Sequence, residues 1–493
     1  MLNSIIKSRY TALTFYMLAG ILLIRWLFIG LMGPMPQDAY YFFYSEHLAL
    51  SYFDHPPGIA YILWLFTSIF GKNVIAIKLA DSIVTMLTVF FFYKLSDSFY
   101  GKERGLKSVL LFFSTLMVTV LSLVSTPDTP LLLFWTISLF LLHKAIFLHK
   151  NIYWIWAGIA MGLAFDSKYS GIFLPAGLML FLLLSTRHRK LLFTIWPWLS
   201  CLFFILTISP VLLWNFENNF ASFRFQGEER MQSASTFILQ PKNLLGLIGH
   251  QSAILGPFIF IFLFYGLYIL IKKYKNKWSE LSAEQLFLLS FFLPVFLLFL
   301  SVSLVYWVKL NWMMPAYISG IIWVSQYINF KWLRIQVVFS FIIHILLAIE
   351  VLYYPFAIRS DDTWFGWKEL SNQVTAIEKK YPVDFIFSAD SYKTAAQLNL
   401  FLPEFIYSEN VIGENALQFD FIGTNLKLLK GKNALFIDSQ PRAASAEKSG
   451  SVPVEVLPYF NSIIELEPII IKNNGLQERK FLVYLCKGYK PLK

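Results

Sequence analysis

Residues 285–304 read QLFLLSFFLPVFLLFLSVSL and contain no charged side chain. A helix needs about 20 mostly apolar residues to cross the hydrocarbon core of a membrane. The whole chain of 493 residues is rich in apolar residues and poor in charged ones, since 57% of it is hydrophobic, 18% aromatic and 14% charged. A soluble domain is about 45–50% apolar and about 25% charged. The sequence therefore predicts a polytopic α-helical membrane protein.

Hydropathy predicts about eleven membrane spans. The first is expected to stay in the mature protein, because its apolar run is longer than that of a signal peptide and no small-residue cleavage site follows. The predicted spans are 10–33, 74–96, 106–124, 131–148, 152–166, 170–185, 190–209, 253–271, 285–304, 312–328 and 335–354. The apolar stretch 56–70 is too short to cross and carries Trp and Tyr, which favours a helix lying at the membrane interface in the first outer loop.

The basic residues predict the orientation. Residues 1–354 hold 25 Lys+Arg and 14 Asp+Glu, whereas the rest holds 16 of each, so the net charge of +11 comes from the membrane part. A cytoplasmic N-terminus puts 17 basic residues in the inner loops and six in the outer loops, as the positive-inside rule requires. The outer six are Lys72, Lys168, Arg224, Arg230, Lys242 and Lys309. The charge therefore predicts topology and not nucleic-acid binding, and the odd number of spans puts the C-terminal region outside.

The pattern of apolar and polar residues changes near residue 355. Short buried strands are predicted at 383–390, 433–438 and 481–486, with a helical segment at 366–380 between the span region and the first of them. This alternation is typical of a small α/β domain. We predict a membrane domain over residues 1–354 and an outer α/β domain over residues 355–493. The two cysteines, Cys201 and Cys486, lie in different regions and form no disulfide framework or zinc spacing.

Polar side chains gather in five of the predicted outer loops. Charged groups at or near membrane depth are costly to place and are functional candidates by default. The candidates are Asp38, Asp54, His55, Asp128, Asp166, Lys168, Arg224, Lys309 and Asn311. Their gathering on one face predicts an active site at the membrane surface.

Each candidate also has a purely structural interpretation. Asp38 and Asp54 could be helix caps, and Asp128, in TPDTP, could be a turn residue. Asp166 and Lys168 could pair with one another. The two side chains Lys309 and Arg224 could reach lipid phosphates at the interface, and His55 could be a structural hydrogen-bonding residue.

The sequence contains no G-x-x-x-x-G-K-[ST], G-x-G-x-x-G, H-E-x-x-H or G-x-S-x-G motif. No inner loop is large enough to hold a nucleotide-binding domain. An activated substrate is therefore expected to arrive from within the membrane or from outside it.

Several segments resemble bacterial glycosyltransferase family 39 and the aminoarabinose-transferase-like proteins, relatives of the protein O-mannosyltransferases with the membrane-embedded GT-C fold. The segments that carry the resemblance are QDAYYFFYSEHLAL (37–50), SYFDHPPGIAYIL (51–63), TPDTPLLLFW (126–135), GLAFDSKYSGIFLP (162–175), SPVLLWNFENNFASFRFQ (209–226), VKLNWMMPAY (308–317), DDTWFGWKEL (361–370) and AAQLNLFLPEF (395–405). The resemblance implies an inverting transferase that moves a sugar from a polyprenyl (undecaprenyl) phosphate carrier to an envelope acceptor such as lipid A at the periplasmic face.

The resemblance also implies roles for particular residues. It makes Asp38 the catalytic carboxylate, and Ala39 stands where the family usually has a second carboxylate. A leaving phosphate needs preorganised cations, for which Arg224, Lys309 and Lys168 are the candidates. Substrate-positioning residues are expected to be Asp128, Tyr40, Asp54 and His55. No metal ligand set and no required cofactor are predicted, although a divalent metal is left open.

The expected partners are the lipid-linked sugar donor, a lipid or glycan acceptor and membrane lipids, and we expect a monomer in the bacterial inner membrane. Two other classes compete with the transferase. A flippase or secondary transporter would use the charged residues as a relay, but transporter sites tend to lie near the midplane between repeats, and the sequence shows no repeat. A membrane receptor with an outer sensing domain would not need five polar loops.

Overall fold

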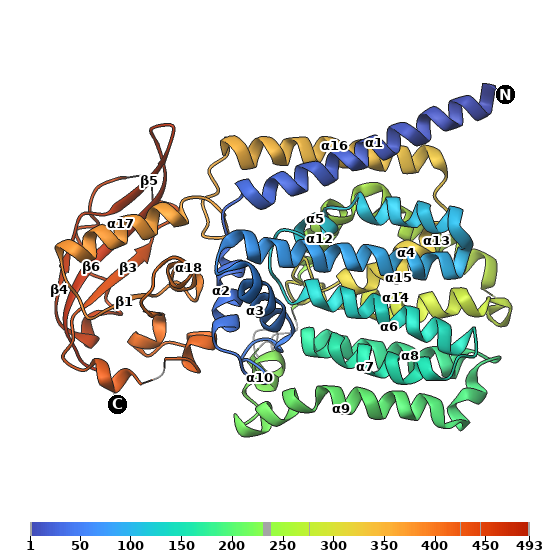
Figure 1. The fold of residues 1–493 in the computed structure, drawn as a ribbon, viewed down its shortest axis with the longest axis horizontal. Helices are drawn as coiled ribbons and strands as arrows, with labels where there is room; N and C mark the ends of the chain where they lie inside the picture. The colour runs from blue at the N-terminus through green and yellow to red at the C-terminus, as the bar shows by residue number, and fades with distance from the viewer. Residues whose placement is uncertain (1, 230–237, 276, 424, 444, 492–493) are drawn as a thin grey trace.

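The computed structural model describes residues 2–229, 238–275, 277–423, 425–443 and 445–491. A bundle of long helices carries a sheet-containing domain at one end, and the N-terminus lies at the opposite end of the bundle (Figure 1). The membrane part contains α1 (Leu2–Leu31), α2 (Pro36–Glu46), α3 (Gly58–Phe70), α4 (Val74–Phe113), α5 (Leu116–Leu121), α6 (Asp128–Ile146), α7 (Ile152–Ser167), α8 (Phe173–Leu184), α9 (Ile195–Glu217), α10 (Ala221–Arg224), α12 (Pro241–Leu255), α13 (Pro257–Tyr274), α14 (Ala283–Val302), α15 (Met314–Val324) and α16 (Phe330–Tyr353).

Within the described residues, six helices are long and apolar enough to span a membrane, or seven if the bent pair α1–α2 is one span. The other predicted spans are present as shorter apolar helices, among them α7, α8 and α15. The structure therefore confirms a multispan helical protein, while the count of eleven stays a prediction.

The predicted spans 74–96 and 106–124 meet in α4, which contains a break at Gly101 with a φ of 75°. The rings of Phe92 and Phe112 stack 4.3 Å apart, although 20 residues of straight helix would separate them by about 30 Å. The chain therefore turns back at Gly101, where a left-handed backbone suits glycine. The second predicted span ends early, because α4 stops at Phe113 and a separate short helix, α5, follows it.

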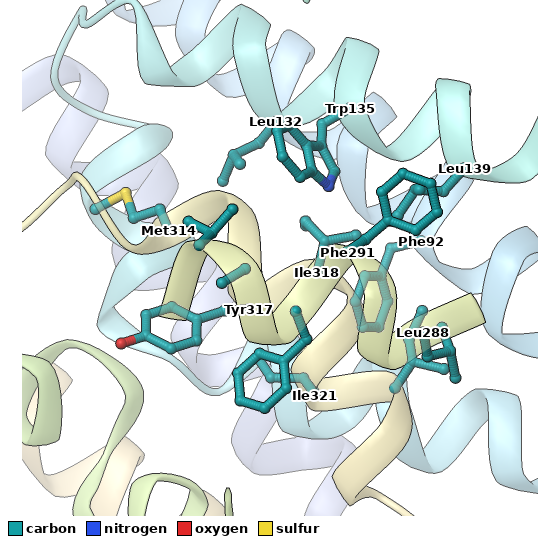
Figure 2. Close-up of a cluster of buried hydrophobic side chains, with 14 of the residues drawn as sticks. Phe92, Leu132, Trp135, Leu139, Leu288, Phe291, Met314, Tyr317, Ile318 and Ile321 are labelled. Atoms are coloured by element: carbon teal, nitrogen blue, oxygen red, sulfur yellow. The ribbon is translucent and has the colours of Figure 1, made fainter. Parts of the chain in front are cut away.

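The core of the bundle surrounds α15. All eleven of its residues are buried, as expected for a helix that is apolar on every side. Figure 2 shows side chains of this helix packed against Trp135, Leu139 and Phe291 from α6 and α14. This buried helix fixes the position of the loop before it, which holds Lys309 and Asn311.

The loop that the sequence predicts as the first outer loop folds into the two short helices α2 and α3. The interfacial stretch predicted at 56–70 forms a helix, as expected, and one face of α3 exposes Tyr61, Trp64 and Ile69. By contrast, α2 is almost entirely buried, including its aromatic run at residues 40–44. The C-terminal domain covers it.

The C-terminal domain contains a six-stranded mixed sheet. Its elements are α17 (Trp367–Lys380), β1 (Phe385–Ser388), α18 (Lys393–Phe401), β2 (Ile406–Tyr407), β3 (Ala434–Ser439), β4 (Phe460–Glu465), β5 (Ile469–Asn473) and β6 (Leu476–Tyr489). The strand order is β2-β1-β3-β6-β4, and β5 also pairs with β6. The strand β1 is parallel to β2 and β3, whereas β6 is antiparallel to β3, β4 and β5. The three predicted strands correspond to β1, β3 and β6.

The sheet domain and the membrane part share one hydrophobic cluster. It runs from Tyr44 in α2 and Ile59 in α3 to Trp367 in α17 and Val483 in β6. The ring of Phe43 stacks on that of Phe419 at 4.4 Å, and α18 packs between the sheet and α2. The packing is therefore continuous across residue 354, where the sequence predicts a domain boundary.

Candidate active site

A cavity of about 1060 Å³ lies where the helical bundle meets the C-terminal domain. Its wall includes Tyr40 and Tyr41 of α2, residues from the loops that follow α2, α5, α7 and α14, and residues of the C-terminal domain. Among the residues predicted as functional, it is lined by Tyr40, Asp54, His55, Lys168, Lys309 and Asn311. Polar groups from loops far apart in the chain therefore meet at one cavity, as the sequence predicts.

The carboxylate of Asp54 lies in this wall and is held by two phenols of α2. Its Oδ1 accepts a hydrogen bond from Tyr44 and a second one from Tyr40, at 3.3 Å. The hydroxyl groups of Tyr44 and Tyr40 lie 3.0 Å apart. Burial, followed by the charge of Asp54, raises the pKa of both phenols well above the usual value. Both therefore stay protonated and act as donors to the carboxylate.

The carboxylate of Asp38 lies elsewhere, behind the cavity wall. It is fully buried and is outside the described lining of the cavity. Its oxygens accept hydrogen bonds from the backbone N–H of Met35 (2.8 Å) and of Ser125 (2.7 Å), and from Lys78 Nζ (3.0 Å). The bond to Met35 belongs to the capping box at the start of α2. Asp38 is therefore the N3 residue of α2, bonded back to the N-cap residue Met35, and not the N-cap itself; its catalytic role stays a prediction.

Another carboxylate, Asp128, orients a lysine of the cavity. Lys168 Nζ lies 2.8 Å and 3.0 Å from the two oxygens of Asp128, and Asn311 Nδ2 donates to the same group at 2.5 Å. Asp128 is 1% exposed, whereas Lys168 and Asn311 reach the cavity. Lys168 thus pairs with Asp128 at the start of α6, and not with Asp166 as in the purely structural alternative.

The three predicted phosphate ligands do not all meet. The two lysines Lys168 and Lys309 line the cavity. Arg224 is exposed, donates a hydrogen bond to the carbonyl oxygen of Asn219 and lies outside the described lining. Arg224 is the last residue of α10, whose N-cap Phe220 has a φ of 58°. Arg230, the other arginine of this loop, lies outside the described residues.

The loop that carries Lys309 and Asn311 is anchored between them. Gln251 of α12 donates from Nε2 to the carbonyl oxygen of Leu310 at 2.9 Å, and its Oε1 accepts from Tyr317 at 2.6 Å. Both Gln251 and Tyr317 are fully buried. This contact joins α12 and α15 to the loop and sets the direction in which Lys309 and Asn311 leave it.

Sequence reasoning missed several residues of this region. Lys78 is a lysine near the start of an apolar span, which is itself a signal of function or of a buried partner. Tyr44, Gln418 and Tyr392 carry no such signal, since phenols and amides are common in helices and loops. Their roles depend on the packing of the C-terminal domain against α2.

The described residues contain no group of three or more His, Cys, Asp or Glu side chains that could hold a metal ion. Protein donors hold three carboxylates of this region: two phenols hold Asp54, Lys78 holds Asp38 and Lys168 holds Asp128.

Solved structures share this architecture over nearly the whole chain. ArnT from Cupriavidus metallidurans superposes with a TM-score of 0.62 in the apo state, at 12% identity, over 96% of this chain and 98% of that chain. The same protein bound to undecaprenyl phosphate gives a TM-score of 0.62 at 13% identity, with the same coverage. The oligosaccharyltransferase of Archaeoglobus fulgidus, in complex with zinc and sulfate, gives 0.50 at 12% identity over 86% of this chain and 68% of that chain. The chain has the GT-C fold.

Sequence comparisons agree with the fold. The family model for dolichyl-phosphate-mannose-protein mannosyltransferase matches residues 54–214. The lipid A galacturonosyltransferase RgtD of Rhizobium johnstonii is 24% identical over 420 residues, which cover 80% of this chain and 85% of that protein. The resemblance to family 39 and aminoarabinose transferases is thus confirmed, and this GT-C protein is a glycosyltransferase rather than a transporter or receptor.

Proposed function

We propose that this glycosyltransferase moves a sugar from a polyprenyl phosphate carrier to lipid A or a related envelope glycolipid. The observation that carries the proposal is the cavity that gathers two lysines and a carboxylate beside the membrane helices. The relative RgtD is named for lipid A, and ArnT has been solved with undecaprenyl phosphate. These two relatives suggest the acceptor and the donor classes, and the cavity contains side chains suited to both.

The two lysines suit the phosphate of the donor. In an inverting transfer the acceptor oxygen attacks the anomeric carbon, and the bond from that carbon to the phosphate oxygen breaks. The electron pair leaves with the carrier phosphate, whose negative charge increases. Lys168 and Lys309 stabilise that charge, and Asp128 together with Asn311 orients Lys168.

The carboxylate of Asp54 suits the acceptor. It takes the proton of an acceptor hydroxyl, or orients an acceptor that is already ionised, such as a lipid phosphate. The phenols of Tyr40 and Tyr44 fix its direction. We therefore propose Asp54 as the carboxylate that meets the acceptor. The resemblance implies Asp38 as the catalytic group. We propose instead that Asp38 has an indirect role, in which it fixes the start of α2 and the side chain of Lys78.

The reaction is proposed to need no metal ion. The carboxylates of Asp38, Asp54 and Asp128 already have protein donors, and the lysines carry the charge that would otherwise fall to a cation. Transfer is expected to persist in EDTA at the same rate as in its absence. A loss of transfer that added Mg²⁺, Mn²⁺ or Zn²⁺ restores would contradict this part of the proposal.

The cavity is proposed to open at the periplasmic face of the inner membrane. The positive-inside rule supports a cytoplasmic N-terminus, and the N-terminus and the C-terminal domain lie at opposite ends of the bundle (Figure 1). We propose a monomer. A cysteine placed in the C-terminal domain, for example Lys448→Cys, should react in intact cells with an impermeant maleimide that crosses only the outer membrane; labelling only after lysis would contradict the orientation.

The experiment is transfer by the purified protein from radiolabelled undecaprenyl phosphate sugars to lipid A. A panel with galacturonic acid and aminoarabinose donors covers the two relatives. Lys309→Met and Lys168→Met are expected to raise the donor KM and lower kcat, whereas Lys242→Met, an exposed lysine at the start of α12, serves as the control. Equal activity in all three variants would contradict the phosphate site, and no transfer from any donor would contradict the proposed acceptor or donor class.

A further inference from the structure

The C-terminal domain forms part of the cavity wall. Trp364, Tyr392 and Leu417 of this domain line the cavity together with the residues of the membrane part. The sequence assigns no chemistry to residues beyond 354, so the contribution of these three is not expected from it. The contacts that the domain makes around Asp54 show what this contribution is.

Gln418 of this domain holds both sides of the Asp54 cluster. Its side-chain Oε1 accepts a hydrogen bond from the backbone N–H of Phe53 at 2.7 Å, directly before Asp54. Its own backbone N–H donates to the hydroxyl of Tyr40 at 3.3 Å, and that hydroxyl in turn donates to Asp54. Gln418 is 3% exposed, so both bonds are made away from water, where losing one is costly.

Tyr392 supports the same cluster from a second direction. Its ring lies 4.2 Å from the ring of Tyr40, at an interplanar angle of 31°. Tyr392 directly precedes α18, the helix that packs on α2. Aromatic contacts of this kind fix ring orientation as well as adding stability. The phenol that donates to Asp54 is therefore held by an amide and by a ring, both from beyond residue 354.

We propose that Gln418 and Tyr392 are positioning residues for sugar transfer, and that the C-terminal domain is consequently part of the active site. This inference rests on the proposed function and assigns the domain a task within it. When the domain is docked, Asp54 points into the cavity. A domain displaced from α2 leaves the membrane part able to bind the donor but without a correctly oriented carboxylate.

A merely structural role predicts a different result, and the chain offers a matched control. Gln397 is also a buried glutamine of the C-terminal domain, 1% exposed, and its Nε2 donates to the carbonyl oxygen of Pro34 at 3.0 Å. It joins the same two parts of the protein as Gln418 does. It bonds to neither Tyr40 nor Asp54 in the described contacts.

The test compares Gln418→Leu with Gln397→Leu in the full chain. Misplacing a catalytic group by about 1 Å can cost about 100-fold in rate. Gln418→Leu is expected to lower kcat by about 10- to 100-fold with little change in donor KM, since both lysines stay in place, and to shift the acidic limb of the pH profile. Gln397→Leu should lower the melting temperature by a similar amount and keep kcat within about threefold. Equal kcat values in the two variants would overturn the inference.

A second pair keeps the inference testable if Gln418→Leu does not fold. Tyr392→Phe retains the ring beside Tyr40 and is expected to keep most of kcat, whereas Tyr392→Leu removes the ring and should lower kcat about tenfold or more. Equal loss in both, or no loss in Tyr392→Leu, would contradict the role of the ring.

A binding measurement separates this inference from the proposed function. Undecaprenyl phosphate is added to the wild-type protein, and hydrogen exchange is followed in peptides covering 390–394 and 416–420. Slower exchange in these segments is expected, because they line or adjoin the cavity. Slower exchange confined to the membrane part would overturn the inference even if transfer occurs. An absence of transfer by the wild type, with protection of these segments intact, would instead contradict the proposed function.

Discussion

Two carboxylates between α1 and α3, Asp38 and Asp54, show how the surroundings of a residue decide its role. Asp38 is surrounded by a lysine and two backbone donors and has no exposed surface. Asp54 is 8% exposed and lines the cavity. Both residues could be selected from the sequence, because acidic groups beside apolar spans are rare. Their different surroundings could not be predicted. Lys78 and Ser125 become neighbours of Asp38 only where α2 meets α4 and the loop after α5, and Tyr44 reaches Asp54 only because the chain turns back after α2.

The buried pair of Lys78 and Asp38 predicts a large loss of stability when one partner is removed. Lys78→Met leaves a carboxylate buried without its cation, a change that typically costs about 3–5 kcal/mol. Lys72→Met is the control, because Lys72 pairs with Glu46 at the surface with 67% of its side chain exposed, where such pairs contribute at most about 1 kcal/mol. Thermal unfolding in detergent measures both. A similar melting temperature for the two variants would contradict the importance of the buried pair.

At the scale of elements, the helices were predictable and their ends were not. Apolar runs predict spans well, because a lipid-facing or buried helix needs a continuous run of apolar residues. The reversal at Gly101 follows from one backbone angle, and β4 and β5 were missed because each has only a short apolar run beside polar residues. The loop at 303–313 could be recognised by its Lys309 and Asn311, but its anchoring by Gln251 depends on how α12 packs.

That anchoring gives a prediction for Gln251→Leu. The substitution leaves the carbonyl oxygen of Leu310 and the hydroxyl of Tyr317 without their partner, at a cost of about 1–3 kcal/mol for each buried group. The loop loosens, so we expect the donor KM to rise more than kcat falls in the transfer assay. Gln285→Leu is the control, because Gln285 bonds to Gln326 at the far end of α15. If the two variants have the same donor KM, the anchor does not position the lysine.

The sheet gives a prediction about pH. Burial, with help from the charge of Asp390, raises the pKa of Asp438 in β3 from 3.8 to about 6. The folded protein therefore binds this proton more tightly than the unfolded chain does, and the contribution of Asp438 to stability falls as the pH rises from about 4 to about 6. Asp438→Asn should be more stable than wild type at pH 7, by at most about 3 kcal/mol, and this advantage should vanish near pH 4. An advantage that does not change with pH would contradict the assignment.

At the scale of the whole molecule, the C-terminal domain and the bundle are parts of one packed structure. The change in composition near residue 355 predicts two domains, but a single cluster joins Phe43 of α2 to Phe419 and to the sheet. This contact could not be predicted, because aromatic residues on a lipid-facing helix and at a domain interface look alike in sequence. The GT-C fold could be predicted from sequence motifs. That both parts of the chain line the cavity could be seen only from the three-dimensional packing.

Shared packing predicts coupled unfolding. The full chain should lose the sheet and the contacts of α2 in one calorimetric transition, because unfolding either part removes packing contacts from the other. Phe419→Ala removes about 3–5 kcal/mol of packing and should lower this single transition. Two separate transitions in the wild type, with only the sheet transition shifted by the variant, would show that the domain folds independently of α2.

The most direct test of the central claim is sugar transfer to lipid A by the wild type and by Asp54→Asn. The wild-type protein is expected to transfer radiolabel from an undecaprenyl phosphate sugar. Asp54→Asn should bind undecaprenyl phosphate as the wild type does and lose transfer by about 100-fold or more, while Asp38→Asn should lose stability together with activity. Full transfer by a folded Asp54→Asn protein would contradict the account of the cavity.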